Sequence, residues 1–201
     1  YLCKKFQLKN MEKERVILGI DPGTNVLGYS IIEQRGKQSQ LLKMDVLVLG
    51  TKDDLSTKMK KLFDQITEII DIFKPDILAI EAPFFGKNVQ SMLKLGRAQG
   101  ICIAAAFSRS IPFVEYSPRK VKQSITGNGA ASKEQVANML QRMFNFESIP
   151  SHLDATDALA VAVCHSYQKE DLLVSNSSVK KTSSKKSSWA SFVSQNPDRV
   201  K

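Results

Sequence analysis

Residues 16–49 contain three strand-like runs in succession, and only a few residues separate each run from the next. The predicted strands cover residues 16–21, 26–34 and 39–49, with an Asp-Pro-Gly turn after the first and an Arg-Gly-Lys-Gln turn after the second. Links this short can join only antiparallel neighbours. We therefore expect the folded part of the chain to begin as a three-stranded antiparallel meander.

Beyond residue 55 the hydrophobic period becomes helical and then alternates between helix and strand. The pattern predicts short, nearly all-apolar strands within residues 76–83 and 111–117, and helices at residues 55–73, 89–108, 120–126, 132–144 and 152–167. The Gly-rich segment 126–132 is expected to be a flexible loop. Such an order predicts an α/β fold in which three antiparallel strands and two further parallel strands form a mixed sheet, with helices on both faces.

Length and charge divide the 201 residues into one folded domain and two basic ends. Residues 1–15 carry a net charge of +3, residues 169–201 carry +4, and residues 16–168 carry only +2 of the total of +9. The first segment is interpreted as a basic extension and residues 16–168 as the folded domain. The Ser/Lys-rich tail is too polar to build a core and is expected to be disordered.

Nothing in the sequence predicts a membrane segment. The longest apolar stretch, "ICIAAAF", has seven residues, whereas a helix that crosses a bilayer needs roughly 20. The three cysteines show no Cys-x-x-Cys spacing, and Cys102 and Cys164 lie in apolar helical runs, where a free thiol packs as a small hydrophobic group. These features favour a reducing, cytoplasmic location.

Four carboxylates occupy related places at the ends of predicted elements. Asp21 and Glu81 end the two most apolar strands, and Asp154 and Asp157 stand three residues apart on one face of the last helix. Two of them have an ordinary alternative: Asp21 precedes a Pro-Gly turn, and Asp154 follows Ser151 at capping-box spacing. Glu81 has no such explanation, because a carboxylate at the end of a buried run needs a partner. Asp157 has none either, because it lies one turn deeper in the helix than a capping residue.

The four acids have no obvious Lys or Arg partner in the sequence, so they would repel one another in a shared cleft. Two divalent cations about 4 Å apart would relieve that repulsion and would also activate water and stabilise a leaving oxygen. Ligation by oxygen alone suits Mg²⁺, with Mn²⁺ as a substitute, better than zinc.

Five segments of the sequence resemble the RuvC family of bacterial Holliday-junction resolvases. They are, in order, "ILGIDPGT", "AIEAPFFGKN", "LKLGRAQG", "VKQSITGNGAASKEQV" and "HLDATDALAVAVCH". The similarity spans about residues 16–167. The resemblance implies a ribonuclease H-like fold, a homodimer and Mg²⁺-dependent symmetric nicking of two opposed strands of a four-way DNA junction. It also implies a 5′-phosphate and a 3′-hydroxyl at each nick, and work beside the RuvA–RuvB branch-migration complex.

The same resemblance assigns roles to individual residues. The family's catalytic, metal-binding acids match Asp21, Glu81, Asp154 and Asp157, with two metal ions expected in each active site. Family lysines near the scissile phosphate match Lys122 and Lys133. The family's aromatic residue that stacks on a DNA base matches Phe84, with Lys87, Arg119 and Lys120 as further phosphate contacts. Gly96 and Gly100, four apart on one helix, match the family's dimer helix and are also expected to pack on the sheet.

Several alternatives stay open at this stage. Phe84 and the lysines are also compatible with core and solvated positions, and some family members have histidine where this chain has Asp157. The "IDPGT" turn also resembles the phosphate-binding hairpin of actin-like ATPases, although such proteins need two hairpins and a longer chain. A noncatalytic junction-binding protein of the same fold is the other alternative. His152 and His165 are given no metal role, and His152 is predicted at the surface.

Overall fold

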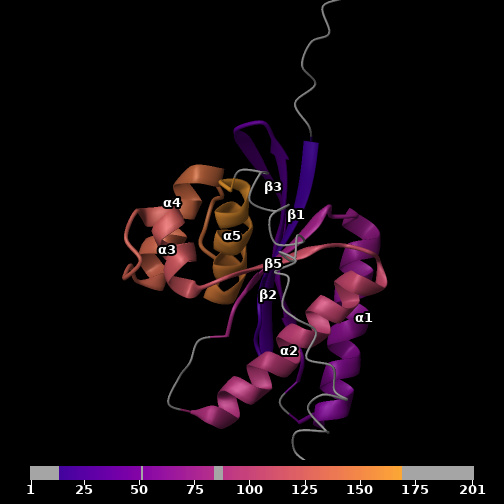
Figure 1. Ribbon diagram of the computed structural model, residues 1–201. Helices are drawn as coiled ribbons and strands as arrows, with labels where there is room; N and C mark the ends of the chain where they lie inside the picture. The colour runs from indigo at the N-terminus through magenta and orange to yellow at the C-terminus, as the bar shows by residue number, and fades with distance from the viewer. Residues whose placement is uncertain (1–13, 51, 84–87, 169–201) are drawn as a thin grey trace, which may run out of the picture. The chain divides into compact units, whose positions relative to one another are not determined.

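The computed structural model describes residues 14–50, 52–83 and 88–168 of the chain. Within these ranges the strands form one five-stranded sheet in the order β3-β2-β1-β4-β5 (Figure 1). Antiparallel pairing joins β1 (Glu14–Asp21) to β2 (Val26–Arg35), and β2 to β3 (Gln38–Val48). Parallel pairing joins β1 to β4 (Ile77–Glu81) and β4 to β5 (Phe113–Tyr116).

Helices cover both faces of this sheet (Figure 1). On one side lie α1 (Leu55–Phe73) and α2 (Val89–Ser108); on the other lie α3 (Pro118–Thr126), α4 (Lys133–Phe144) and α5 (Leu153–Ser166). The predicted mixed α/β fold is therefore confirmed. None of the helices in the described ranges is long and apolar enough to cross a bilayer. The predicted tail and most of the predicted N-terminal extension lie outside the described residues, but Glu14 and Arg15 belong to β1.

The two-residue alternation of the strands decides which side chains face α5. In β1, Leu18 and Ile20 belong to the core shared with α1 and α2. Their neighbours Gly19 and Asp21 must therefore face the opposite side, where α5 lies. The same alternation in β4, where Leu78 and Ile80 join that core, directs the last residue of the strand toward α5. Both strand-end acids thus face one side of the sheet.

Two glycines allow α5 to lie directly on the strands. A Cβ atom on Gly19 would be 2.3 Å from the carbonyl oxygen of Ala158, and one on Gly28 would be 1.9 Å from the carbonyl oxygen of Asp154. The Ser30 hydroxyl, opposite Gly19, donates a hydrogen bond of 3.0 Å to the same Ala158 oxygen. Because no side chain larger than hydrogen fits at either glycine, the separation between α5 and the sheet is fixed by backbone contact.

A buried histidine, His165, links the last turns of α5 to β1 and β5. Its ring nitrogens lie 2.6 Å from Nη2 of Arg15 and 2.7 Å from the hydroxyl of Tyr116. A guanidinium can only donate, so Nε2 of His165 accepts and Nδ1 carries the proton that is donated to Tyr116. Burial, followed by the charges of Arg15 and Lys120, lowers the pKa of His165 to about 4. His152, by contrast, is exposed, as predicted.

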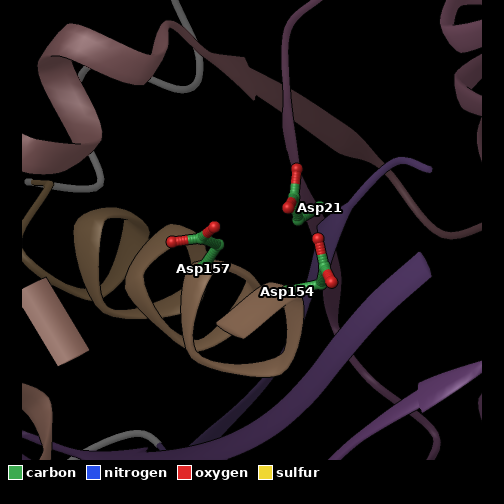
Figure 2. A group of neighbouring side chains, drawn as sticks. All are labelled: Asp21, Asp154 and Asp157. Atoms are coloured by element: carbon green, nitrogen blue, oxygen red, sulfur yellow. The ribbon is translucent and has the colours of Figure 1, made fainter. Parts of the chain in front are cut away.

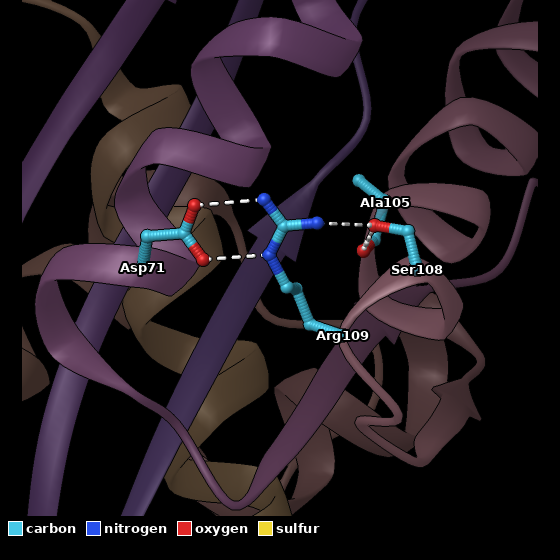
Figure 3. Close-up of polar contacts among 4 residues, drawn as sticks. All are labelled: Asp71, Ala105, Ser108 and Arg109. Carbon is cyan, nitrogen blue, oxygen red and sulfur yellow. Dashed lines mark hydrogen bonds and ion pairs between the residues drawn. The ribbon is translucent and has the colours of Figure 1, made fainter.

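An ion pair joins the C-terminal ends of α1 and α2 on the other side of the sheet (Figure 3). Arg109, the C-cap residue of α2, donates from Nε and Nη2 to the two carboxylate oxygens of Asp71 at 2.7 and 2.9 Å. Its Nη1 also reaches the hydroxyl of Ser108 at 3.4 Å, and that hydroxyl donates to the carbonyl oxygen of Ala105 at 2.7 Å. The end of α2 is thereby held against α1.

Candidate metal centre and active site

Three aspartates meet where β1 ends and α5 begins. Asp21 is the last residue of β1, and Asp154 and Asp157 stand one turn apart at the start of α5 (Figure 2). Each offers a carboxylate oxygen, and these oxygens all lie within 4.8 Å of one another. The arrangement follows from β-strand pairing, because Asp21 lies opposite Gly28 in β2, and Gly28 contacts the backbone of Asp154.

The start of α5 excludes the simple capping explanation for Asp154. The N-cap residue is His152, and no side chain accepts a capping hydrogen bond there. Asp154 lies in the first turn of the helix, close to the free backbone N–H groups whose partial positive charge stabilises an anion. Asp154 therefore does not cap the helix. Asp154 and Asp157 share one face of α5, and this face is turned toward Asp21.

Glu81 completes the acidic group from the end of β4. Burial raises its pKa to about 7, and the charge of Asp157 adds to the rise, while Lys133 and Lys122 oppose it. Its carboxylate is not part of the group of oxygens within 4.8 Å, which the three aspartates form. The alternation along β4 places it beside Asp21, and its negative charge acts on that residue.

The raised pKa of Asp21 indicates that the site would be stabilised by a bound cation. Burial is the largest cause that raises its pKa, to about 8, and the charges of Glu81, Asp157 and Asp154 raise it further against the opposing effect of Lys133. Burial also raises the pKa of Asp157 above its ordinary value. A divalent cation among these oxygens would favour the ionised carboxylates, and an all-oxygen donor set suits Mg²⁺ or Mn²⁺. The residues present therefore fit a divalent metal site.

The expectation that the acids have no basic partner is wrong. The ammonium of Lys133, the first residue of α4, donates to Oδ2 of Asp157. Lys122, on α3, is near enough for its charge to act on Glu81 and Asp157. The ion pair joins residues 24 positions apart, and it forms because α4 packs against α5. Both lysines that the family resemblance assigned to the scissile phosphate thus lie beside the acidic group.

The other predicted DNA contacts are distributed around this centre. Lys120 places its ammonium 5.0 Å from the centre of the Tyr116 ring, so it lies over an aromatic face. Arg119 packs against Gly129 and lines a cavity of about 660 Å³. That cavity is also lined by Ser117, Pro118, Lys122 and Asn128. Phe84 and Lys87 lie outside the described residues.

The two glycines predicted at a dimer interface lie on the exposed side of α2. A Cβ atom on Gly96 or Gly100 would meet no atom of another part of the described chain within 4 Å. The expectation that they also pack on the sheet is therefore wrong, because the buried face of α2 is formed by other residues, among them Ala98, Cys102 and Ala105. The interface part of that prediction stays a prediction.

Sequence reasoning missed the contribution of Gly19 and Gly28. Neither glycine carries a functional group, yet both set the distance between the strands and the helix that bears two of the acids. A signal was present, because a glycine inside an otherwise β-branched or apolar strand marks a close approach by another backbone. The hydrogen bonds of His165 had no comparable local signal.

A mixed sheet that carries at its strand ends an acidic group fit for a divalent cation is the arrangement that a metal-dependent nuclease of the ribonuclease H-like class requires. The family described as crossover junction endodeoxyribonuclease RuvC matches residues 17–165. RuvC of Cytophaga hutchinsonii is 53% identical over 195 residues, covering 96% of this chain and 92% of the relative. RuvC of Porphyromonas gingivalis is 51% identical over 191 residues, covering 94% and 98% of the two chains.

Solved structures agree with the sequence relatives. T. thermophilus RuvC in complex with a Holliday junction substrate matches with a TM-score of 0.72 and 30% identity, covering 76% of this chain and 93% of the other. The yeast mitochondrial Holliday junction resolvase Ydc2 matches with a TM-score of 0.57 and 17% identity, covering 75% and 77% of the two chains, which supports the fold alone. The chain belongs to the RuvC family of crossover junction endodeoxyribonucleases, and the predicted family is confirmed.

Proposed function

We propose that this protein resolves four-way DNA junctions by divalent-metal-dependent nicking of two opposed strands. The observation that carries the proposal is the convergence of Asp21, Asp154 and Asp157 in a chain of the RuvC family. The T. thermophilus relative has been solved with a Holliday junction substrate, which supports the same substrate class here. The actin-like ATPase alternative is not favoured, because such proteins need two phosphate-binding hairpins and this sequence contains one "IDPGT" turn.

Asp21, Asp154 and Asp157 would hold the metal ions, and Glu81 would complete the site from β4. Bound divalent cations supply activated water and stabilise charge on the leaving oxygen. The protein contributes the geometry: backbone contact at Gly28 fixes the start of α5 against the end of β1. Mg²⁺ is the ion proposed, with two per active site and Mn²⁺ as a substitute.

The basic residues around the centre would bind and orient the DNA backbone. Lys122 and Lys133 lie beside the acids and would place their charges against the scissile phosphate, where negative charge develops during cleavage. Arg119 and Lys120, on the first turn of α3, would contact phosphates farther along the strand. Phe84 and Lys87 keep their proposed roles in base stacking and phosphate contact.

A homodimer would place two such sites on one junction. The exposed side of α2 is apolar beyond the two glycines: Val89 is 60% exposed, Leu93 52% and Phe107 59%. An apolar helix face of this kind is typical of an interaction surface, and Gly96 and Gly100 would let the partner helix approach closely. Two related active sites would account for symmetric nicking of opposed strands.

Three further parts of the proposal rest on the family resemblance and the composition. Action beside RuvA–RuvB and a cytoplasmic location are consistent with the family's role in recombination and repair. The basic tail at residues 169–201 would add nonspecific DNA affinity through its lysines, and its deletion should then reduce the salt dependence of binding. The domain limits, a folded part at residues 16–168 between basic ends, are retained as proposed.

The decisive test offers the purified protein a synthetic four-way junction or a plain duplex, with Mg²⁺ or with EDTA. Paired nicks at symmetric positions of the junction, with Mg²⁺ only, are expected. Asp21→Asn should abolish nicking while junction binding survives. Asp64→Asn is the matched control, because Asp64 lies on α1 in an exposed ion pair with Lys60. Junction binding without nicking, in both Mg²⁺ and Mn²⁺, would instead establish the noncatalytic alternative.

A further inference from the structure

Lys133 is paired with a carboxylate that metal binding would also use. Its ammonium donates to Oδ2 of Asp157, one of the three aspartates that form the metal centre. A divalent cation on the same carboxylate would lie close to the ammonium, and the two positive charges would repel each other. The ion pair and metal coordination at this carboxylate therefore oppose each other.

The environment of Lys133 extends this competition to the rest of the centre. Burial works to lower its pKa, but the hydrogen bond to Asp157 and the charges of Asp157, Asp21 and Asp154 outweigh burial, so that the pKa is raised. The ammonium therefore interacts with the same three aspartates that would bind the metal. It also opposes the rise in the pKa of Asp21 and Glu81.

The two partners differ in their freedom to move. The side chain of Asp157 is 14% exposed and sits on α5, whereas that of Lys133 is 52% exposed. The backbone of Lys133 is fixed at the start of α4, because Ser132 and Gln135 form a capping box there. A lysine with a fixed backbone and a half-exposed, flexible side chain can leave Asp157 without rearranging the helix.

A DNA phosphate is the natural second acceptor for this ammonium. Lys122, whose charge also acts on Asp157, marks the same region as positive, and the cavity lined by Arg119 and Lys122 adjoins it. A phosphate placed between these cations would attract Lys133 away from the carboxylate. The exchange costs little, since one charge-assisted hydrogen bond replaces another.

We propose that Lys133 couples metal binding to phosphate docking by exchanging partners: in the free protein it holds Asp157, and a docked phosphate takes it over and releases Asp157 to a divalent cation. The inference rests on the proposed function, because it assumes that these aspartates bind the metal. In consequence, the metal centre of the nuclease is complete only when a substrate phosphate has docked. By linkage, the phosphate and the cation then favour each other's binding.

Metal affinity of the DNA-free protein gives the first test. Mn²⁺ is titrated into wild type, Lys133→Met and Lys133→Arg, and free Mn²⁺ is measured by electron paramagnetic resonance. Lys133→Met should bind Mn²⁺ at least about tenfold more tightly than wild type, within the usual range of such couplings, whereas Lys133→Arg should stay close to wild type. The control is Lys60→Met, which also removes a lysine paired with an aspartate but lies on α1.

Junction binding in EDTA gives the second test, since no cleavage takes place there. Lys133→Met should reduce the slope of log K against log salt concentration by about 0.9, the value expected for one lost phosphate contact, and Lys60→Met should leave it unchanged. Unchanged or weaker Mn²⁺ binding by Lys133→Met, or an unchanged salt slope, would overturn the exchange. If wild type nicks junctions while either result is found, the resolvase proposal stands and only the exchange fails.

Discussion

Protonation of one residue, His165, should make a destabilising contribution in acid. The imidazole is 1% exposed, and its pKa is lowered from 6.5 to about 4 by burial and then by the charges of Arg15 and Lys120. Between pH 6.5 and 4 the unfolded chain binds a proton at this residue and the folded protein does not. The contribution of His165 to stability is therefore lost as the pH falls through this window and regained as it rises.

The size of the effect follows from the two pKa values. A difference from 6.5 to about 4 corresponds to roughly 3 kcal/mol at 1.36 kcal/mol per pKa unit. A loss of this size lowers the melting temperature of a chain of this length by roughly 10 °C. Protonation would also turn Nε2 into a donor that faces the guanidinium of Arg15, so the 2.6 Å hydrogen bond there cannot survive it.

Urea unfolding of wild type and His165→Gln is compared at pH 7.0, 6.0, 5.0 and 4.5, roughly the range in which His165 titrates differently in the folded and unfolded states. The comparison separates the effect of His165 on stability from the effects of all other titrating groups. Carboxylates contribute equally to both proteins, so the difference in pH slope reports His165. His165→Gln should be less stable at pH 7 but should lose less stability on acidification. His152→Gln, at the exposed histidine, should keep the wild-type slope. Parallel slopes for wild type and His165→Gln would refute the reasoning.

Three further outcomes are expected. Gly28→Ala should weaken Mn²⁺ binding and lower the melting temperature, because the new methyl group would collide with the backbone of Asp154. Gly100→Ala, where the methyl group would meet no neighbouring atom among the described residues, should keep the metal affinity, and equal effects would contradict this. EDTA should lower the melting temperature of wild type measured in Mg²⁺, by an amount equivalent to about 2.7 kcal/mol if the ion was present at 100 times its Kd. Asp21→Asn should lose this dependence, and an undiminished response would show that the ion binds elsewhere. A double-mutant cycle of Asp71→Ala and Arg109→Ala should give a coupling of about 1 kcal/mol or less, because both side chains are about half exposed; a coupling several times larger in urea unfolding would disprove that estimate.

The sheet and the four acids could be anticipated because they depend on short-range rules. Short connections require antiparallel pairing, and alternation along β1 and β4 decides the face that carries Asp21 and Glu81. The three-residue spacing of Asp154 and Asp157 likewise fixes their common side of α5. In each case residues within a few positions of one another contain the information.

The missed contacts join elements that are distant in sequence. The ion pair of Lys133 and Asp157 depends on how α4 packs against α5. The hydrogen bond between Arg15 and His165 joins residues 150 positions apart. Neither follows from periodicity, because helix packing against a sheet is set by the shapes of all the side chains between them. The expectation that Gly96 packs on the sheet failed for the same reason: periodicity places it on a face of α2 without saying which face is inward.

Because the strand and the helix are in contact at Gly28, this position of the active site tolerates no added side chain. The clearance between strand and helix is that of a single hydrogen atom, and no flexible side chain lies there to absorb an addition. Larger residues would change the spacing of the acids in one abrupt step, with no gradual loss. A survey of substitutions scored only by activity would therefore rank this chemically inert position beside the carboxylates themselves.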